Sequence, residues 1–206
     1  MRQGKTLLAP VSFELHKGEF LWLTGPSGAG KTTLLKIIAS LLDASGGEVR
    51  FNGQPMVELK PEQYRQQVSY VFQTPQLFGR TVYDNLVLPY QIRQQPADRQ
   101  HLGAELERLG LSSEMLDTPI DQLSGGEKQR VALLRNVQFP PEILLLDEIS
   151  SALDDANKQR VAQLIDLLVA RGSAAIWISH DSAETGDGRR RLRLSPPTTE
   201  HQHESA

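Results

Sequence analysis

The sequence predicts an α/β fold, in which helices pack on a sheet of parallel strands. Two runs of consecutive apolar residues, Ile143–Leu146 and Ala174–Ile178, are typical of parallel strands that are buried on both faces. A third apolar run, Phe20–Thr24, leads into a glycine-rich stretch and then into a helical pattern that begins at Lys31. The chain has 206 residues, 39% of them hydrophobic, which suits one domain with room for an inserted subdomain.

Composition and charge exclude several classes of protein. Cysteine is absent, which excludes disulfides and thiolate metal sites. The net charge of −3 gives no overall attraction to nucleic acid or to anionic lipid. No apolar run approaches the ~20 residues that a membrane-spanning helix needs, and no signal peptide is evident. We therefore expect a cytosolic protein that would reach a membrane only through a partner.

The N-terminal third alternates between strand and helix patterns. Val11–Leu15 alternates apolar and polar residues, which predicts a half-buried strand that forms a hairpin with Phe20–Thr24. The helix from Lys31 is expected to run to about Leu42 and to stop at Ser45-Gly46-Gly47. A further strand, Glu48–Phe51, should end in a hairpin turn at Asn52-Gly53.

The middle of the chain changes character. Pro61 opens a short helix through Gln67, and Val68–Phe72 reads as a strand that ends at Gln73. From Thr81 to about Met115 the apolar spacing is helical, with Pro96 between two helices. This section has no strand signal, which predicts a helical insertion between strands of the core.

The remaining elements return to the α/β pattern. Expected helices are Ser124 to about Val137, stopped by Pro140-Pro141, and Asp154 to about Ala170. Arg189–Leu194 is a candidate for a last, exposed strand, although its arginine run also fits a solvated face. The polar tail 195–206 is expected to be disordered, and its His201 and His203 form at most a weak ligand pair.

The glycine-rich stretch is a phosphate-binding loop. Gly25, Gly30, Lys31 and Thr32 fit the pattern G-x-x-x-x-G-K-[ST]. The complete loop is Gly25, Pro26, Ser27, Gly28, Ala29, Gly30, Lys31, Thr32 and Thr33. Its N–H groups and the following helix dipole attract an anion; we expect Lys31 to reach the β- and γ-phosphates and Thr32 to bind Mg²⁺. A simple glycine-rich helix cap is the alternative, and the strand before and the helix after the loop argue against it.

Two carboxylates follow the apolar strand at Ile143–Leu146. The carboxyl ends of parallel strands are where α/β folds place their ligands. We expect Asp147 to hold Mg²⁺, through water, and Glu148 to polarise the attacking water. The alternative is a pair of turn carboxylates at the end of a strand. The phosphate-binding loop disfavours it, because such a loop needs a carboxylate that binds the metal.

Ser124 and Glu127 predict a capping box for the helix that follows them. Capping does not need Gly125-Gly126, which cost backbone entropy. Two glycines at a helix N-terminus make a second anion cradle. Because the first loop already holds phosphates, this cradle suggests phosphates that another chain presents.

The order of these motifs resembles the ABC-type ATPases, the nucleotide-binding domains of ABC transporters. It comprises the phosphate-binding loop, Gln73, Leu123–Glu127, Ile143–Glu148, Ser151–Asp154 and His180. The resemblance covers about residues 7 to 185. It implies a P-loop NTPase with a RecA-like core, an antiparallel β subdomain and an inserted α-helical subdomain of about residues 81–122, within an ATPase domain of residues 1–194.

The resemblance also implies roles for individual residues. Gln73 would touch Mg²⁺ or water and sense a transmembrane partner. In an ATP-dependent homodimer, Ser124, Gly125 and Gly126 would bind the γ-phosphate of ATP held by the opposite subunit. Asp154 would belong to the loop that crosses the dimer. His180 would contact the γ-phosphate, although a histidine after a strand is by itself more often structural.

Between the motifs, the chain is more specifically similar to the ATP-binding subunits of FetA-type iron exporters. The similar stretches are Leu59–Tyr70, Gln73–Leu86 and Asp147–Asp154. The implied protein hydrolyses ATP on the cytoplasmic face of the inner membrane and drives export of iron or a related metal through a separate permease. Thr74–Tyr83 lies where such domains dock their membrane subunit.

The sequence departs from the family pattern at three points. Ile149 stands where many ABC ATPases have proline. No aromatic residue clearly occupies the place that stacks on adenine, and Gly186–Arg191 is a poor match to the helix and strand that usually follow the histidine in this family.

The alternative functions are an ABC exporter ATPase for a lipid, peptide or drug, a soluble ABC ATPase that acts on DNA or ribosomes, and a scaffold without turnover. A single short helical block disfavours the soluble ATPase, and the intact Lys31, Asp147, Glu148 and His180 disfavour the scaffold.

Overall fold

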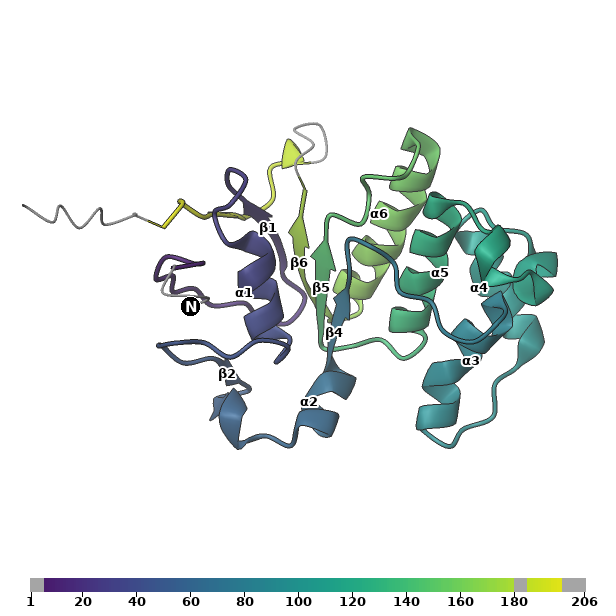
Figure 1. The fold of residues 1–206 in the computed structure, drawn as a ribbon, viewed down its shortest axis with the longest axis horizontal. Coiled ribbons are helices and arrows are strands. Elements are labelled where there is room, and N and C mark those ends of the chain that lie inside the picture. The colour runs from purple at the N-terminus through teal and green to yellow at the C-terminus, as the bar shows by residue number, and fades with distance from the viewer. Residues whose placement is uncertain (1–5, 180–184, 198–206) are drawn as a thin grey trace, which may run out of the picture.

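The computed structural model describes residues 6–179 and 185–197. Its centre is a parallel sheet of five strands in the order β4-β5-β6-β1-β7 (Figure 1). The strands are β1 Phe20–Thr24, β4 Val68–Val71, β5 Ile143–Asp147, β6 Ala174–Ile178 and β7 Arg191–Arg193. The predicted α/β fold class and the three apolar strands are therefore confirmed.

The two faces of the sheet are covered by different helices, which explains the continuous apolar runs. Side chains alternate between the faces, so that neighbours such as Leu145 and Leu146 lie in separate core clusters. One cluster includes α1 (Lys31–Ile38), and the other includes α5 (Gly125–Val137) and α6 (Asp155–Ala170). Both clusters are needed to bury the sheet.

Two smaller units extend the core. A hairpin of β2 (Arg50–Phe51) and β3 (Gln54–Pro55) turns at Asn52 and Gly53, which both have positive φ, and this confirms the turn that the Asn-Gly pair predicted. A short 3₁₀ turn and α2 then lead into β4. Their bounds are Met56–Glu58 and Pro61–Gln67.

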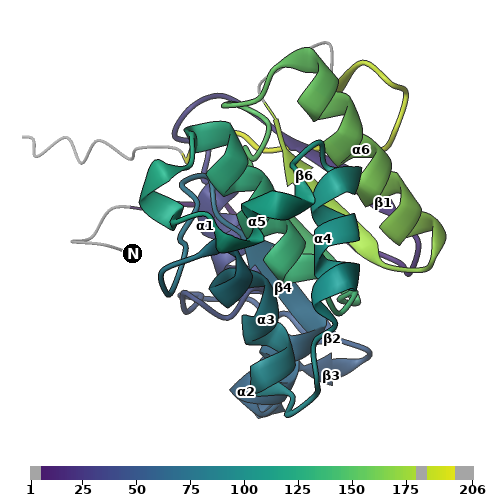
Figure 2. The same cartoon turned by 90° about the vertical axis from the view of Figure 1, so that its right-hand side faces the viewer.

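The helical block lies against α5. It contains α3 (Val82–Ile92) and α4 (Arg99–Arg108), and Figure 2 shows both helices beside α5. Two 3₁₀ turns, Ser113–Asp117 and Ile120–Gln122, return the chain to the start of α5. The two predicted helices on either side of Pro96 are confirmed.

The strand predicted at Val11–Leu15 is wrong, because these residues form neither a strand nor a hairpin with β1. The side chains of Val11, Phe13 and Leu15 are nevertheless half-buried against the α1 cluster, whereas Ser12 and Glu14 are exposed. The alternation therefore identified a buried side of an extended segment. It could not identify a hydrogen-bonded neighbour.

The first helix is shorter than predicted. It ends at Ile38 instead of Leu42, because Ser40 adopts a left-handed conformation with φ 54°. The N–H groups of Leu41 and Ser40 then donate to the carbonyls of Lys36 and Ile37, at 2.8 and 3.0 Å. This is a Schellman motif formed without glycine, so its usual sequence signal is missing.

The arginine run near the C-terminus is more than a solvated face. Arg189 pairs with Asp166 and Asp187 and lies 4.4 Å from the ring centre of Phe20. Arg190 pairs with Glu19. These contacts hold the segment beside β1, where β7 forms the last strand, as expected. No helix in the described part of the chain is both long and apolar enough to cross a bilayer.

Candidate nucleotide site

The phosphate-binding loop joins β1 to α1 at the carboxyl end of the sheet. Gly25, Gly28 and Gly30 all have positive φ. A Cβ on Gly25 would come within 2.5 Å of the carbonyl oxygen of Leu194, and one on Gly30 equally close to that of Leu7. Glycine is therefore required at both ends of the loop. Gly28, by contrast, faces open space.

Lys31 lies inside this loop. Its side chain is 6% exposed, and its ammonium group donates to the carbonyls of Gly25 at 2.8 Å and Pro26 at 3.1 Å. Burial lowers the pKa of Lys31, while the nearby Glu148 and Asp147 act in the opposite direction. The first turn of α1 has no acidic residue. A buried cation at a helix N-terminus is a site for a negatively charged ligand, and phosphate fits it.

Asp147 lies at the end of β5 and is 2% exposed. Its Oδ1 accepts a hydrogen bond from Oγ1 of Thr32 at 3.1 Å, which confirms that the strand end and the loop meet. Its Oδ2 accepts a hydrogen bond from the hydroxyl of Tyr70 at 2.5 Å. A hydroxyl and a carboxylate side by side are the donors that Mg²⁺ prefers, so these residues fit the metal.

Glu148 has a left-handed backbone with φ 50°, which is unusual for a residue other than glycine. Its N–H donates to the carbonyl of Ile178 on β6 at 3.1 Å. Its Oε2 accepts a hydrogen bond from Nε2 of Gln73 at 2.9 Å. The fold thus brings Gln73, which follows the edge strand β4, to the carboxylate that follows β5.

The capping box predicted at Ser124 is present. Oγ of Ser124 accepts from the N–H of Glu127 at 3.3 Å, and the Glu127 carboxylate accepts from the N–H of Ser124 at 2.7 Å. This second bond lowers the pKa of Glu127. A Cβ on Gly126 would lie 3.1 Å from the carbonyl oxygen of Ala152, so this glycine permits close packing, whereas Gly125 faces open space.

Asp154 is the N-cap of α6. Its carboxylate accepts from the backbone N–H of Asn157 at 2.8 Å and from the side-chain amide of the same residue at 3.0 Å. These bonds give it a structural role within its own chain. His180 lies outside the described residues, as do His201 and His203, so their expected roles stay predictions.

Sequence reasoning missed several buried hydrogen-bonding residues, among them Tyr70 and Arg130. Burial raises the pKa of Tyr70, which therefore remains a hydrogen-bond donor to Asp147. Arg130 is 7% exposed and donates to the carbonyls of Gly126 and Leu109 and to Oδ1 of Asn157, at 3.2, 2.8 and 2.6 Å. It ties α5 to the start of α6. Local sequence did not single out either residue, because Asp147 is 77 positions from Tyr70 and Asn157 is 27 positions from Arg130.

The segment Thr74–Tyr83 is held by Asn85, which is fully buried. The side chain of Asn85 bonds both the N–H and the carbonyl of Phe78, at 2.8 and 2.7 Å. Phe78 itself is 53% exposed, so it does not pack under its own loop. Arg135 lies over this ring at 4.7 Å from its centre.

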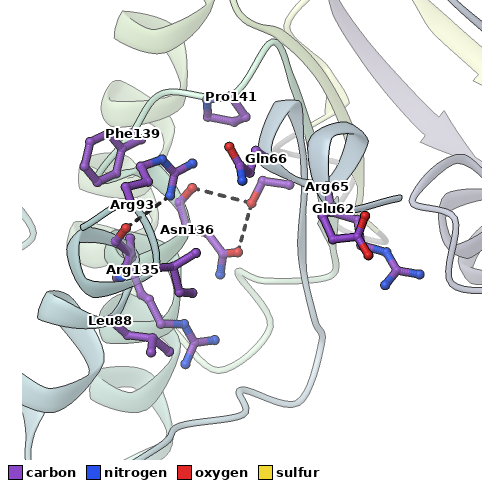
Figure 3. A pocket seen from close by; sticks show the side chains of 12 residues that line it. Glu62, Arg65, Gln66, Leu88, Arg93, Arg135, Asn136, Phe139 and Pro141 are labelled. Atoms are coloured by element: carbon purple, nitrogen blue, oxygen red, sulfur yellow. Dashed lines mark hydrogen bonds between the residues drawn. The ribbon is translucent and has the colours of Figure 1, made fainter. Parts of the chain in front are cut away.

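A groove of about 330 Å³ lies between α2 and β4 on one side and α3 and α5 on the other (Figure 3). Its apolar lining comes mainly from Leu88, Ile92 and Phe139. Its charged lining is Glu62, Arg65, Arg93 and Arg135. Burial lowers the pKa of Arg135 to about 10. Within the described residues, none of these three arginines forms an ion pair with a carboxylate.

Comparison with known proteins identifies the family. Residues 8–151 match the model of the ABC transporter family. The chain belongs to this family. It is 49% identical to the probable iron export ATP-binding protein FetA of Escherichia coli K12, over 95% of this chain and 88% of that protein. The predicted resemblance to FetA-type ABC ATPases is confirmed, and the chain is an ABC ATPase that binds ATP.

Other ABC proteins are similar at lower identity. The cell division ATP-binding protein FtsE of the same organism is 38% identical over 86% of this chain and 82% of its own length. The spermidine/putrescine import protein PotA of Bacteroides thetaiotaomicron is 38% identical over 87% of this chain and 39% of its own length. Similarity at this level thus extends to ABC ATPases with different tasks.

Solved structures confirm the fold class. A dimeric post-hydrolysis state of the ATP-binding cassette MJ0796, bound to ADP and Pi, matches with a TM-score of 0.85 at 28% identity. The match covers 95% of this chain and 90% of that one. An Atm1-family ABC exporter with ATP bound matches with the same TM-score at 27% identity, over 94% of this chain and 35% of the exporter chain.

Proposed function

We propose that this ABC ATPase hydrolyses magnesium-bound ATP in a head-to-tail dimer and drives export of iron or a related metal through a separate membrane permease. One observation carries the chemistry: Thr32, Asp147 and Glu148 converge beside the loop that holds Lys31. The choice of iron rests on the 49% identity to FetA, which extends over 95% of the chain.

Each residue has a separate task in this proposal. Lys31 and the N–H groups of the loop bind the β- and γ-phosphates. Thr32 and Asp147 would hold Mg²⁺, which neutralises phosphate charge when it is bound. Glu148 orients the attacking water and accepts its proton. Gln73, hydrogen-bonded to Glu148, links this carboxylate to the segment Thr74–Tyr83.

The dimer completes each site. The space beside Gly125 is open. A helix N-terminus with room beside it favours a phosphate presented by a second copy. Ser124, Gly125 and Gly126 would then contact the γ-phosphate of the opposite subunit, with Asp154 in the loop at the dimer contact. The dimeric form of MJ0796 supports this arrangement. The contact of His180 with the γ-phosphate belongs to the same proposal.

The groove beside Phe78 is the proposed docking site of the permease. Leu88, Ile92 and Phe139 offer apolar contact, and the three arginines favour an acidic residue on the docking segment of the partner. The chain would then lie on the cytoplasmic face of the inner membrane and touch the membrane only through the permease. In this proposal metal selectivity belongs to the permease, and nucleic acid has no role.

The transported substrate is tested in cells. A strain that lacks the gene is complemented with the wild-type gene, with Glu148→Gln or with an empty vector, and grown in excess iron or in excess zinc. We expect only the wild-type gene to restore low cellular iron. Unchanged iron content in the deletion strain would remove iron as the substrate and favour another exported substrate, while the ATPase assignment would stand.

A further inference from the structure

Tyr70 lies next to Asp147 because of the register between two strands. Tyr70 on β4 pairs with Leu145 on β5, and Asp147 follows Leu145 by two residues. Side chains two residues apart on a strand lie on the same face of a sheet. Tyr70 and Asp147 therefore share the face that α1 covers, and they are 7% and 2% exposed.

The two oxygens of Asp147 have different partners. Oδ1 accepts from Thr32 of the phosphate-binding loop at 3.1 Å, and Oδ2 accepts from the hydroxyl of Tyr70 at 2.5 Å. Two donors on opposite oxygens fix the plane of a carboxylate. The bond from Tyr70 thus keeps Oδ1 directed at the loop.

We propose that Tyr70 is a positioning residue for the magnesium site, which orients the Asp147 carboxylate without touching metal or nucleotide. This inference rests on the proposed role of Thr32 and Asp147 as the residues that hold Mg²⁺. Partners that orient a metal-binding carboxylate typically change metal affinity by ~10–100-fold when they are removed. We expect an effect of this size.

The ring of Tyr70 is held independently of its hydroxyl. It packs in the buried cluster beside α1 and meets the ring of Phe72 edge to face, with 4.6 Å between the ring centres. Tyr70→Phe therefore keeps the ring contacts and removes only the hydrogen bond to Asp147. Because this leaves Oδ2 buried without its donor, the variant also loses some stability.

Tyr64 provides a matched control for that loss. It belongs to the same buried cluster, is 3% exposed, and donates its hydroxyl hydrogen bond to the carbonyl of Ile38 at 2.5 Å. The acceptor, Ile38, is the last residue of α1, whereas Asp147 is the last residue of β5. Tyr64→Phe removes a buried phenol hydrogen bond of the same length without changing the carboxylate.

The test compares wild type, Tyr70→Phe and Tyr64→Phe. Calorimetry with a non-hydrolysable ATP analogue gives the affinity in EDTA and at a series of Mg²⁺ concentrations, and thermal unfolding is measured for each metal-free chain. For Tyr70→Phe we expect the half-saturating Mg²⁺ concentration to rise ~10–100-fold, with unchanged affinity in EDTA. For Tyr64→Phe we expect a lower unfolding temperature and an unchanged Mg²⁺ requirement.

Three results would overturn the inference. A wild-type Mg²⁺ requirement in Tyr70→Phe would show that Asp147 needs no positioning by the hydroxyl. If the half-saturating Mg²⁺ concentration rose equally in Tyr70→Phe and Tyr64→Phe, the change would reflect lost stability and not the position of Asp147. If the wild type bound nucleotide equally well with and without Mg²⁺, the proposed magnesium site would be wrong, and so would the role of Tyr70.

Discussion

The amide of Gln73 donates a hydrogen bond to the carboxylate of Glu148 over 2.9 Å, although the two residues lie 75 positions apart. Gln73 directly precedes the segment Thr74–Tyr83, which carries the exposed Phe78, and Glu148 follows the buried Asp147. A hydrogen bond therefore joins the start of the segment beside the proposed docking groove to the proposed catalytic carboxylate. In the proposed function, this bond would couple docking of the permease to the hydrolysis site.

Glu148→Gln should abolish turnover and retain ATP binding. The amide has nearly the shape of the carboxylate, but it cannot accept a proton from water. General-base catalysis contributes about 10²- to 10⁴-fold, so we expect the ATPase rate to fall by that factor. Steady-state hydrolysis and nucleotide affinity are measured on the same preparation. Near wild-type turnover would contradict the assignment of Glu148 as the base.

Lys31→Ala should weaken nucleotide binding itself. A hydrogen bond to a charged group is worth about 1.5–3 kcal/mol, which corresponds to a loss of roughly 10- to 100-fold in affinity. Lys31→Met serves as the control, because it keeps the buried stem and removes only the charge. Calorimetric titration with ATP should show similar losses for both variants. Affinity retained in the methionine variant would mean that the charge is dispensable.

Dimerisation should depend on the γ-phosphate. If Gly125 and Gly126 bind ATP held by a second copy, the Glu148→Gln chain should be a monomer without nucleotide and a dimer with ATP. Light scattering with ATP, with ADP and without nucleotide distinguishes these states. Equal amounts of dimer with ADP and with ATP would argue against a γ-phosphate at the interface.

Discrimination between nucleotide bases should be weak. The resemblance to ABC ATPases predicts no adenine-stacking aromatic residue within residues 1–206, and one such stack contributes about 1–3 kcal/mol. ATP and GTP should therefore bind within about tenfold of each other, a difference of ~1.4 kcal/mol. Calorimetry provides both affinities. A preference for ATP of several hundred-fold would require another stacking residue.

Phe78→Ala should uncouple the permease and leave the isolated ATPase intact. Phe78 is 53% exposed, so little packing is lost, whereas exposed aromatic residues are frequent anchors of protein interfaces. Tyr83 is the contrast, because it packs against the core and lies under Arg99, 4.9 Å from the ring centre. Tyr83→Ala should lower the unfolding temperature. If Phe78→Ala pulled down the permease at the wild-type level, the docking site would have to lie elsewhere on the chain.

Sequence patterns that depend on neighbouring residues predicted their structures correctly. The phosphate-binding loop, the capping box of Ser124 with Glu127 and the hairpin turn at Asn52-Gly53 are all present. In each case the residues that carry the signal also make the contact. The unpaired segment Val11–Leu15 and the early end of α1 at Ile38 were missed, since a missing strand partner and a left-handed Ser40 leave no such local signal.

The sequence by itself determined the family, and it predicted the phosphate-binding loop and the two carboxylates of the proposed site. Only the tertiary structure decided which side chains support them. The strand order β4-β5-β6-β1-β7 places Tyr70 beside Asp147, and the crossover from β1 through α1 brings Thr32 to the same carboxylate. These partners come from three separate elements. Their meeting depends on strand order and register, which are set by packing of the whole sheet rather than by any local run of residues.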